Sequence, residues 1–170
     1  EPAMVERVRW IERQMDWVAA AARENEPVSV FVPIWYEPWM TFNAHTYAHN
    51  LLRICGGYNV FAARDWEDSP GAAASQAEST DQPGPASRDV RYPRITLDDV
   101  VHAQPAVVLL PNEPYPFAET HAQLIAALDI PAARQGRIHF VDGTLLTWHG
   151  TRLAQALSEI PPLLAIENEA

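Results

Sequence analysis

Large aromatic side chains gather in three loops, each of which follows a predicted β-strand. The loops span residues 35–43, 111–117 and 142–150. Their aromatic and neighbouring side chains are Trp35, Tyr36, Trp39, Met40, Phe42, Tyr115, Phe117, Trp148 and His149. Aromatic rings supply apolar contact area with few rotatable bonds, which suits a flat or bulky ligand. The loops therefore predict a ligand-binding surface, and the competing interpretation is that the rings fold beneath the loops as core.

Other residue combinations indicate catalysis or metal binding more weakly. Asp142, His149 and Ser158 match a hydrolase triad in residue type, but no G-x-S-x-G turn occurs and Ser158 falls within a predicted helix. His45 and His49 are four residues apart on a predicted helix, a spacing that can place two metal ligands on one face, yet no acid lies between them. We therefore expect no metal site, and an α/β enzyme with a site at the same loops is the alternative function.

Composition and charge exclude several classes of partner and site. The 170 residues include 22 acidic and 12 basic side chains, and the formal net charge of -10 disfavours nucleic acid as a partner. Cys55 is the only cysteine, so the chain has no internal disulfide and no cysteine cluster for a metal. Neither a G-x-G-x-x-G motif nor a P-loop occurs, so a nucleotide would find no phosphate cradle.

An alternation of helices and strands must position the three loops. Residues 3–24 predict one long helix, because apolar residues recur at nearly helical spacing. Strands are predicted at 28–35, 59–62, 106–110 and 137–141, and further helices at 46–54, 95–99, 119–128 and 151–160. This order predicts an α/β fold with a largely parallel sheet sandwiched by helices and preceded by the long helix. Ligands of such sheets bind outside the carboxyl ends of the strands, where the three loops lie.

Residues 65–90 interrupt the alternation with a change of composition. Asp, Ser, Ala, Gln, Gly and Pro dominate this segment. Such a composition is typical of a mobile surface insertion. A linker between domains is not expected here, since the patterns on both sides belong to one α/β alternation.

Three motifs follow one another along the chain: a helix that ends in CGGYNVF, the loop LLPNEPYPF and the loop DGTLLTW. They belong to the longer segments PIWYEPWMTFNAHTYAHNLLRICGGYNVFA, RYPRITLDDVVHAQPAVVLLPNEPYPF and VDGTLLTWHGTRLAQAL. With these segments the chain resembles the second lobe of class III periplasmic substrate-binding proteins, the helical-backbone metal receptors of ABC importers. The resemblance covers nearly the whole chain outside residues 65–90.

The resemblance implies a substrate-binding component rather than an enzyme. Such proteins capture a metal chelate (cobalamin, heme or an iron–siderophore) between two lobes and deliver it to a permease, without an intrinsic cofactor. Residues 1–25 would be the backbone helix between the lobes and 26–170 the C-terminal lobe, with the N-terminal lobe expected before Glu1. The location would be periplasmic, or anchored to the membrane outside the cytoplasm.

The resemblance also implies roles for individual residues. The ligand-binding side chains would be Trp35, Tyr36, Trp39, Met40, Arg91, Tyr92, Tyr115, Trp148 and His149. Arg91 or Arg94 would meet an acidic group of the ligand, and Glu37 and Glu113 are the candidates for docking on permease arginines. One lobe alone would expose half a cleft and the apolar stripe of the long helix, so self-association is expected.

Overall fold

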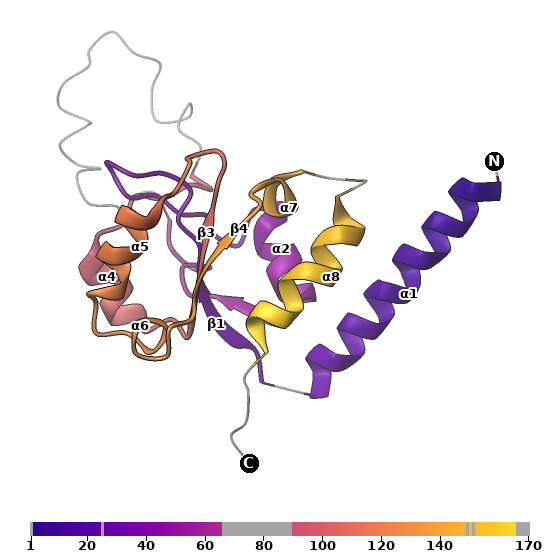
Figure 1. Ribbon diagram of the computed structural model, residues 1–170, viewed down its shortest axis with the longest axis horizontal. Helices are drawn as coiled ribbons and strands as arrows, with labels where there is room; N and C mark the ends of the chain where they lie inside the picture. The colour runs from indigo at the N-terminus through magenta and orange to yellow at the C-terminus, as the bar shows by residue number, and fades with distance from the viewer. Residues whose placement is uncertain (1, 25, 66–89, 149, 151, 166–170) are drawn as a thin grey trace, which may run out of the picture.

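A parallel four-stranded sheet in the order β2-β1-β3-β4 lies at the centre of the computed structural model (Figure 1). The structure describes residues 2–24, 26–65, 90–148, 150 and 152–165. The strands are β1 (Val28–Phe31), β2 (Gly57–Asn59), β3 (Val107–Pro111) and β4 (Ile138–Val141). The α/β fold with a parallel sheet is therefore confirmed.

Helices cover both faces of this sheet (Figure 1). One face carries α2 (Tyr47–Ile54), α7 (Thr144–Thr147) and α8 (Leu153–Leu164), with α1 (Pro2–Glu24) outside α8. The other face carries α4 (Leu97–Ala103), α5 (Glu119–Ala126) and α6 (Pro131–Arg134). Val18 of α1 is buried, whereas Val5, Val8 and Trp10 are exposed, so the predicted apolar surface of this helix is present and self-association stays a prediction. None of the described helices is long and apolar enough to cross a membrane.

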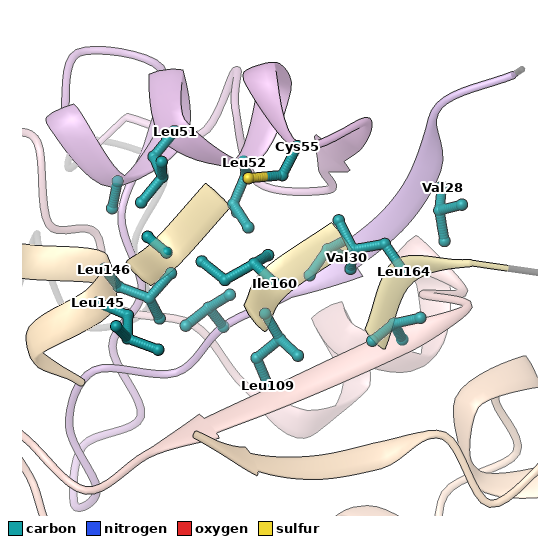
Figure 2. Close-up of a cluster of buried hydrophobic side chains, with 14 of the residues drawn as sticks. Val28, Val30, Leu51, Leu52, Cys55, Leu109, Leu145, Leu146, Ile160 and Leu164 are labelled. Carbon is teal, nitrogen blue, oxygen red and sulfur yellow. The ribbon is translucent and has the colours of Figure 1, made fainter. Parts of the chain in front are cut away.

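Successive residues of the central strands supply two separate cores. In β3, Val107 and Leu109 face the helices α2, α7 and α8, and Val108 and Leu110 face the opposite layer. Figure 2 shows the first core, which Leu109 shares with leucines of α2 and α7 and with Ile160 of α8. Each fully buried aliphatic side chain of this kind stabilises the fold by about 1.5–3 kcal/mol.

Cys55 belongs to that first core (Figure 2). Burial raises the pKa of its thiol to about 12. A thiol that stays protonated is a poor nucleophile and a poor metal ligand. Cys55 is thus a packing residue.

The expected elements are present, with several boundaries shifted. The strand predicted over 28–35 ends at Phe31, and the chain then folds into a hairpin in which the Ile34 amide donates to the Met40 carbonyl at 2.8 Å. The strand predicted over 59–62 lies earlier, because Asn59 turns the chain: its side chain donates to the Phe42 carbonyl and accepts from the Phe61 amide.

Two short helices and one extension were not expected from the sequence. Helix α7 lies within the predicted loop 142–150, and α6 follows α5. Helix α8 begins at Leu153 and continues through Pro161 and Pro162. The two prolines cannot donate backbone hydrogen bonds, and the burial of Leu164 offsets the free-energy cost of this loss. The expected cap at Thr96 is confirmed, since its hydroxyl accepts from the Asp99 amide at 3.1 Å and α4 begins one residue later.

The segment predicted as a mobile insertion lies outside the described residues except at its two ends. Those ends meet at one buried side chain, because Asn43 Nδ2 donates to the carbonyl oxygens of Arg64 and Val90, each at 3.1 Å. The chain thus leaves and rejoins the described fold at the same place. The mobile insertion itself stays a prediction.

Candidate functional site: a pocket at the carboxyl ends of the strands

A pocket of about 490 Å³ opens at the carboxyl ends of β1 and β3. Its wall consists of Val32, Ile34, Trp35, Met40, Phe42, Thr46, Tyr47, Ala48, Arg91, Tyr92, Pro111, Glu113, Pro114, Leu146 and Thr147. These residues come from the end of β3, from the segments that follow β1, β3 and β4, and from the segment that begins at residue 90. The volume is within the usual range of small-molecule sites, and the place is the one where parallel α/β sheets bind ligands.

The aromatic part of the wall is held by backbone pairing between two distant segments. Trp35 and Met40 face each other across the hairpin, and Met40 also bridges to Arg94. Beyond that bridge the Asn43 amide donates to the Arg91 carbonyl at 2.9 Å. The segment that starts at 91 is thereby aligned with 40–43, and this alignment brings Tyr92 and Arg91 to the pocket.

Arg91 is the cation of the pocket wall. It is exposed, and its guanidinium carbon lies 5.6 Å from the centre of the Tyr92 ring. The guanidinium carries a permanent positive charge, which attracts a carboxylate. The wall can therefore offer one positive group to a ligand with an acidic edge.

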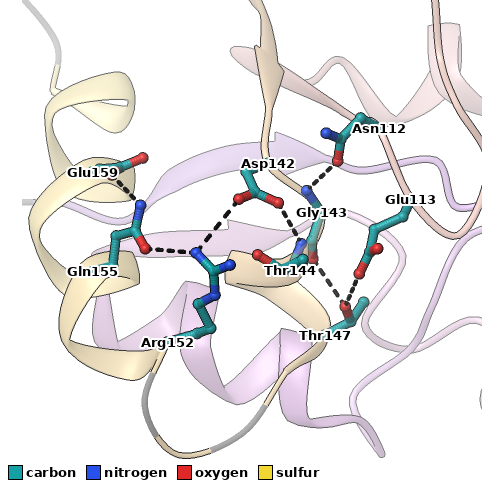
Figure 3. Close-up of polar contacts among 9 residues, drawn as sticks. All are labelled: Asn112, Glu113, Asp142, Gly143, Thr144, Thr147, Arg152, Gln155 and Glu159. Carbon is teal, nitrogen blue, oxygen red and sulfur yellow. Dashed lines mark hydrogen bonds and ion pairs between the residues drawn. The ribbon is translucent and has the colours of Figure 1, made fainter.

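Glu113 is the anion of the wall, and Gly143 fixes its backbone (Figure 3). A Cβ on Gly143 would lie 2.3 Å from the Glu113 carbonyl oxygen and 2.9 Å from its nitrogen, so only glycine fits there. The Thr147 hydroxyl donates to the Gly143 carbonyl at 2.9 Å and lies 3.4 Å from Glu113 Oε1. Asn112 Oδ1 accepts from the Gly143 amide at 2.8 Å and closes the contact between the two loops.

Asp142 and Ser158 have separate local roles. Hydrogen bonds from Thr144, assisted by Arg152 at 3.8 Å, hold the pKa of Asp142 below its ordinary value (Figure 3). The Ser158 hydroxyl donates to the Gln155 carbonyl within α8. Asp142 therefore shapes the start of α7, and Ser158 is engaged in its own helix.

A second group of rings, which we term the aromatic cluster, lies behind the pocket wall. It consists of Tyr36, Trp39, Tyr115, Phe117 and His121. Trp39 stacks on Phe117 with ring centres 5.9 Å apart, and Tyr36 meets His121 edge-on at 4.8 Å. Trp35 connects the cluster to the pocket, because its ring centre lies 5.5 Å from that of Tyr115.

The predicted ligand residues are thus divided between several places. Four of them line the pocket: Trp35, Met40, Arg91 and Tyr92. Three belong to the aromatic cluster: Tyr36, Trp39 and Tyr115. Trp148 follows α7 outside the pocket wall and is 58% exposed, and His149 lies outside the described residues. Of the two docking candidates, Glu113 lines the pocket, and Glu37 is exposed on the hairpin. Their roles stay predictions.

The sequence did not point to Thr46, Tyr47 and Ala48 as site residues. They form the start of α2, directly after the first aromatic loop. Helical spacing placed them in a helix, and only the parallel arrangement of the sheet shows that this end faces the pocket. Thr147, predicted to lie in a loop, reaches the pocket because α7 folds there.

Metal ligands do not cluster among the described residues, where no group of three His, Cys, Asp or Glu side chains is suitably placed. His49 is buried on α2, and burial, followed by the charges of Arg53 and His45, lowers its pKa. Met40, whose thioether is a donor type that binds heme iron in other proteins, lines the pocket, whereas the Tyr47 hydroxyl is buried and burial raises its pKa.

Among the comparisons with known proteins, the solved structures identify the fold. No family model and no curated protein matches the sequence. Among solved structures, the periplasmic heme-binding protein RhuT from Roseiflexus matches at 19% identity with a TM-score of 0.60, over 92% of this chain and 53% of that chain. The periplasmic vitamin B12 binding protein BtuF of Vibrio cholerae matches at 15% identity and a TM-score of 0.60, over 90% and 50%.

An ABC transporter substrate-binding protein from Listeria monocytogenes matches at 16% identity and a TM-score of 0.59, over 90% of this chain and 53% of that chain. The chain spans about half the length of the solved structures it matches. The resemblance to class III periplasmic binding proteins that the motifs indicated is therefore confirmed at the level of the fold.

Proposed function

We propose that this chain is part of the substrate-binding component of an ABC importer and that its pocket forms one wall of a cleft for a metal chelate. The observation that carries the proposal is the position of an aromatic-lined pocket at the carboxyl ends of the sheet. The fold around it is shared with heme-binding and vitamin B12-binding proteins. An importer would place this component outside the cytoplasm.

The pocket wall offers a chelate three kinds of contact. Trp35 and Tyr92 supply apolar surface for a flat macrocycle. Arg91 supplies a cation for an acidic substituent. Met40 adds a thioether side chain to the same wall.

Delivery of the ligand would use an exposed carboxylate on this lobe. Glu113 lines the pocket beside Thr147, whereas Glu37 is exposed and lies on the hairpin that carries Trp35. Exposure favours Glu37 as the group that meets arginines of a permease. A Glu37→Arg variant should bind chelate normally and fail in transport, and normal transport by that variant would assign docking elsewhere.

The binding proposal can be tested by titrating the chain with hemin, cobalamin and a ferric siderophore, with visible absorbance and tryptophan fluorescence as signals. Trp35→Ala should weaken binding by about tenfold or more, because central aromatic residues dominate interface energies. Trp10→Ala is a matched control, since Trp10 is 40% exposed on α1 and Trp35 is 44% exposed.

Two results would contradict the proposal. The first is that none of the chelates changes either signal. The second is that Trp35→Ala and Trp10→Ala weaken binding to the same extent, which would indicate adsorption to exposed indoles. The alternative of an α/β enzyme has no observation among the described residues in its favour, as Asp142 and Ser158 have separate partners.

A further inference from the structure

We propose that His121 is a positioning residue for the pocket wall. Its imidazole, in the tautomer that carries hydrogen on Nε2, fixes the Tyr115 ring, and Tyr115 fixes the indole of Trp35. His121 comes from α5, on the opposite face of the sheet from the helices that border the pocket, and it does not line the pocket itself. The effect on chelate binding rests on the proposed function, whereas the effect on Trp35 does not.

The hydrogen bonds of His121 define its tautomer. The backbone amide of Ala118 donates to Nδ1 at 3.0 Å, so Nδ1 presents its lone pair and the hydrogen of the neutral ring is on Nε2. Nε2 lies 3.3 Å from the Tyr115 hydroxyl oxygen and donates to it. Both ring nitrogens thus have defined roles, one as the cap of α5 and one as the donor to Tyr115.

Ring contacts hold the imidazole on several sides. Its centre lies 4.8 Å from that of Tyr36, 5.3 Å from that of Tyr115 and 5.4 Å from that of Phe117, all at steep angles. Edge-to-face packing of this kind favours one orientation of each ring. His121 therefore cannot turn without disturbing the aromatic cluster.

Tyr115 connects the fixed imidazole of His121 to the pocket wall. Its ring meets the Trp35 indole edge-on, with centres 5.5 Å apart and an angle of 67°. Trp35 is 44% exposed, so much of its surface faces solvent and the contact with Tyr115 limits the motion of its inner side. The indole is then ordered before a ligand arrives, and binding is spared the cost of ordering it.

Two variants separate this role from simple stability. His121→Gln retains a cap for α5, because a glutamine three residues after the N-cap can accept from the N-cap amide, but it loses the ring and the bond to Tyr115. Tyr115→Phe retains the ring and removes the oxygen. Thr120→Ala, at an exposed position of α5, is the matched control.

The readouts are the ¹⁵N signals of His121 and the indole N–H signal of Trp35, which is identified by its loss in Trp35→Phe. We expect the Nε2–H tautomer in the wild type. The Trp35 signal should move in His121→Gln and Tyr115→Phe, and it should not move in Thr120→Ala. Chelate affinity should fall about three- to tenfold in the first two variants, the cost of ordering one side chain on binding.

An Nδ1–H tautomer, or a Trp35 signal that is unchanged in a folded His121→Gln variant, would overturn the proposal. Unchanged chelate affinity in both variants would overturn its link to the pocket. If the wild type binds none of the chelates, the proposed function fails, and the Trp35 signal still decides the role of His121.

Discussion

The pocket wall and the aromatic cluster draw on the same two loops and end in different environments. Trp35 lies at the pocket, 44% exposed, whereas the next residue, Tyr36, turns toward Trp39, Tyr115 and His121 in the cluster. In the second loop Glu113 lines the pocket, and Tyr115, two residues later, packs in the cluster. Residues that are neighbours in sequence therefore lie on opposite sides of one loop, one at the pocket and one in the aromatic cluster.

The difference teaches that an aromatic loop residue can serve a ligand in two ways. A ring at the pocket offers contact area directly, at little benefit to the stability of the fold. A ring in the cluster is covered by other rings and the second core, so it stabilises the loop that holds the first ring. Substitutions should therefore separate binding from stability.

The largest expected effect on stability is in the cluster. Phe117 is 6% exposed and contacts Trp39, Tyr115 and His121. Phe117→Ala should lower the free energy of unfolding by about 3–5 kcal/mol, as for other buried aromatic deletions. Trp35→Ala should cost about 1 kcal/mol or less, since much of that ring is already in water. Urea unfolding measures both, and equal losses would remove the distinction between the two groups.

The next effect is at the contact between the loops that follow β3 and β4. Gly143→Ala should cost about 3 kcal/mol, because the new methyl group overlaps the Glu113 backbone and one loop must move. Gly136→Ala is the control: its Cβ would meet nothing within 4 Å, and its φ of +64° predicts a penalty of about 1–2 kcal/mol. A Gly143→Ala variant as stable as the control would contradict the tight contact.

A smaller effect concerns Asp99, far from the pocket wall. Partial burial acts to raise its pKa, but hydrogen bonds from Thr96 and the charge of Arg64 at 3.2 Å outweigh it and leave the pKa below its ordinary value. A lowered folded-state pKa stabilises the fold at neutral pH, and this contribution is lost as the pH falls through that pKa.

Asp99→Asn should therefore cost about 1–2 kcal/mol near pH 7, and the difference from wild type should shrink as the pH falls through the lowered pKa, which lies below the ordinary value of 3.8. Asp98→Asn, at the exposed neighbouring position, should differ little from wild type at either pH. Unfolding at the two pH values checks this, and a pH-independent cost for Asp99→Asn would mean that the carboxylate charge is not involved.

The smallest effect is expected from removing residues 66–89. Because Asn43 joins the Arg64 and Val90 carbonyls, a short Gly–Ser connection should close the gap and change stability by less than about 1 kcal/mol. Circular dichroism and urea unfolding of the shortened chain measure the change. Loss of the folded state would show that this segment is not an insertion.

The sequence predicted the architecture well because its signals are local. Alternating apolar strands and helices gave the element order, and Thr96 marked the start of α4 correctly. The missed helix α7 is a single turn that depends on tertiary support: the Asp142 carboxylate accepts from the Thr144 amide, and Leu145 and Leu146 are buried in the first core. No periodicity over four residues can indicate such a turn.

The site was predicted only in part, because the sequence assigned all aromatic residues of a loop to the ligand-binding surface. By residue type, Trp35, Tyr36 and Tyr115 were equally good candidates. Whether each ring faces the pocket or the aromatic cluster depends on the hairpin between Ile34 and Met40, and the sequence does not show that pairing. Tyr47 was missed for a related reason, since a helix start becomes part of a pocket only when the strands are aligned beside it.

The central claim is that a chelate lies against the pocket wall, and the methionines test it directly. The chain has three, of which Met40 lines the pocket and Met4 and Met15 lie on α1. With ¹³C-methyl methionine, titration with hemin or cobalamin should shift or broaden the Met40 signal and leave the other two unchanged. An unchanged Met40 signal at saturation, or a change confined to the α1 signals, would contradict the account.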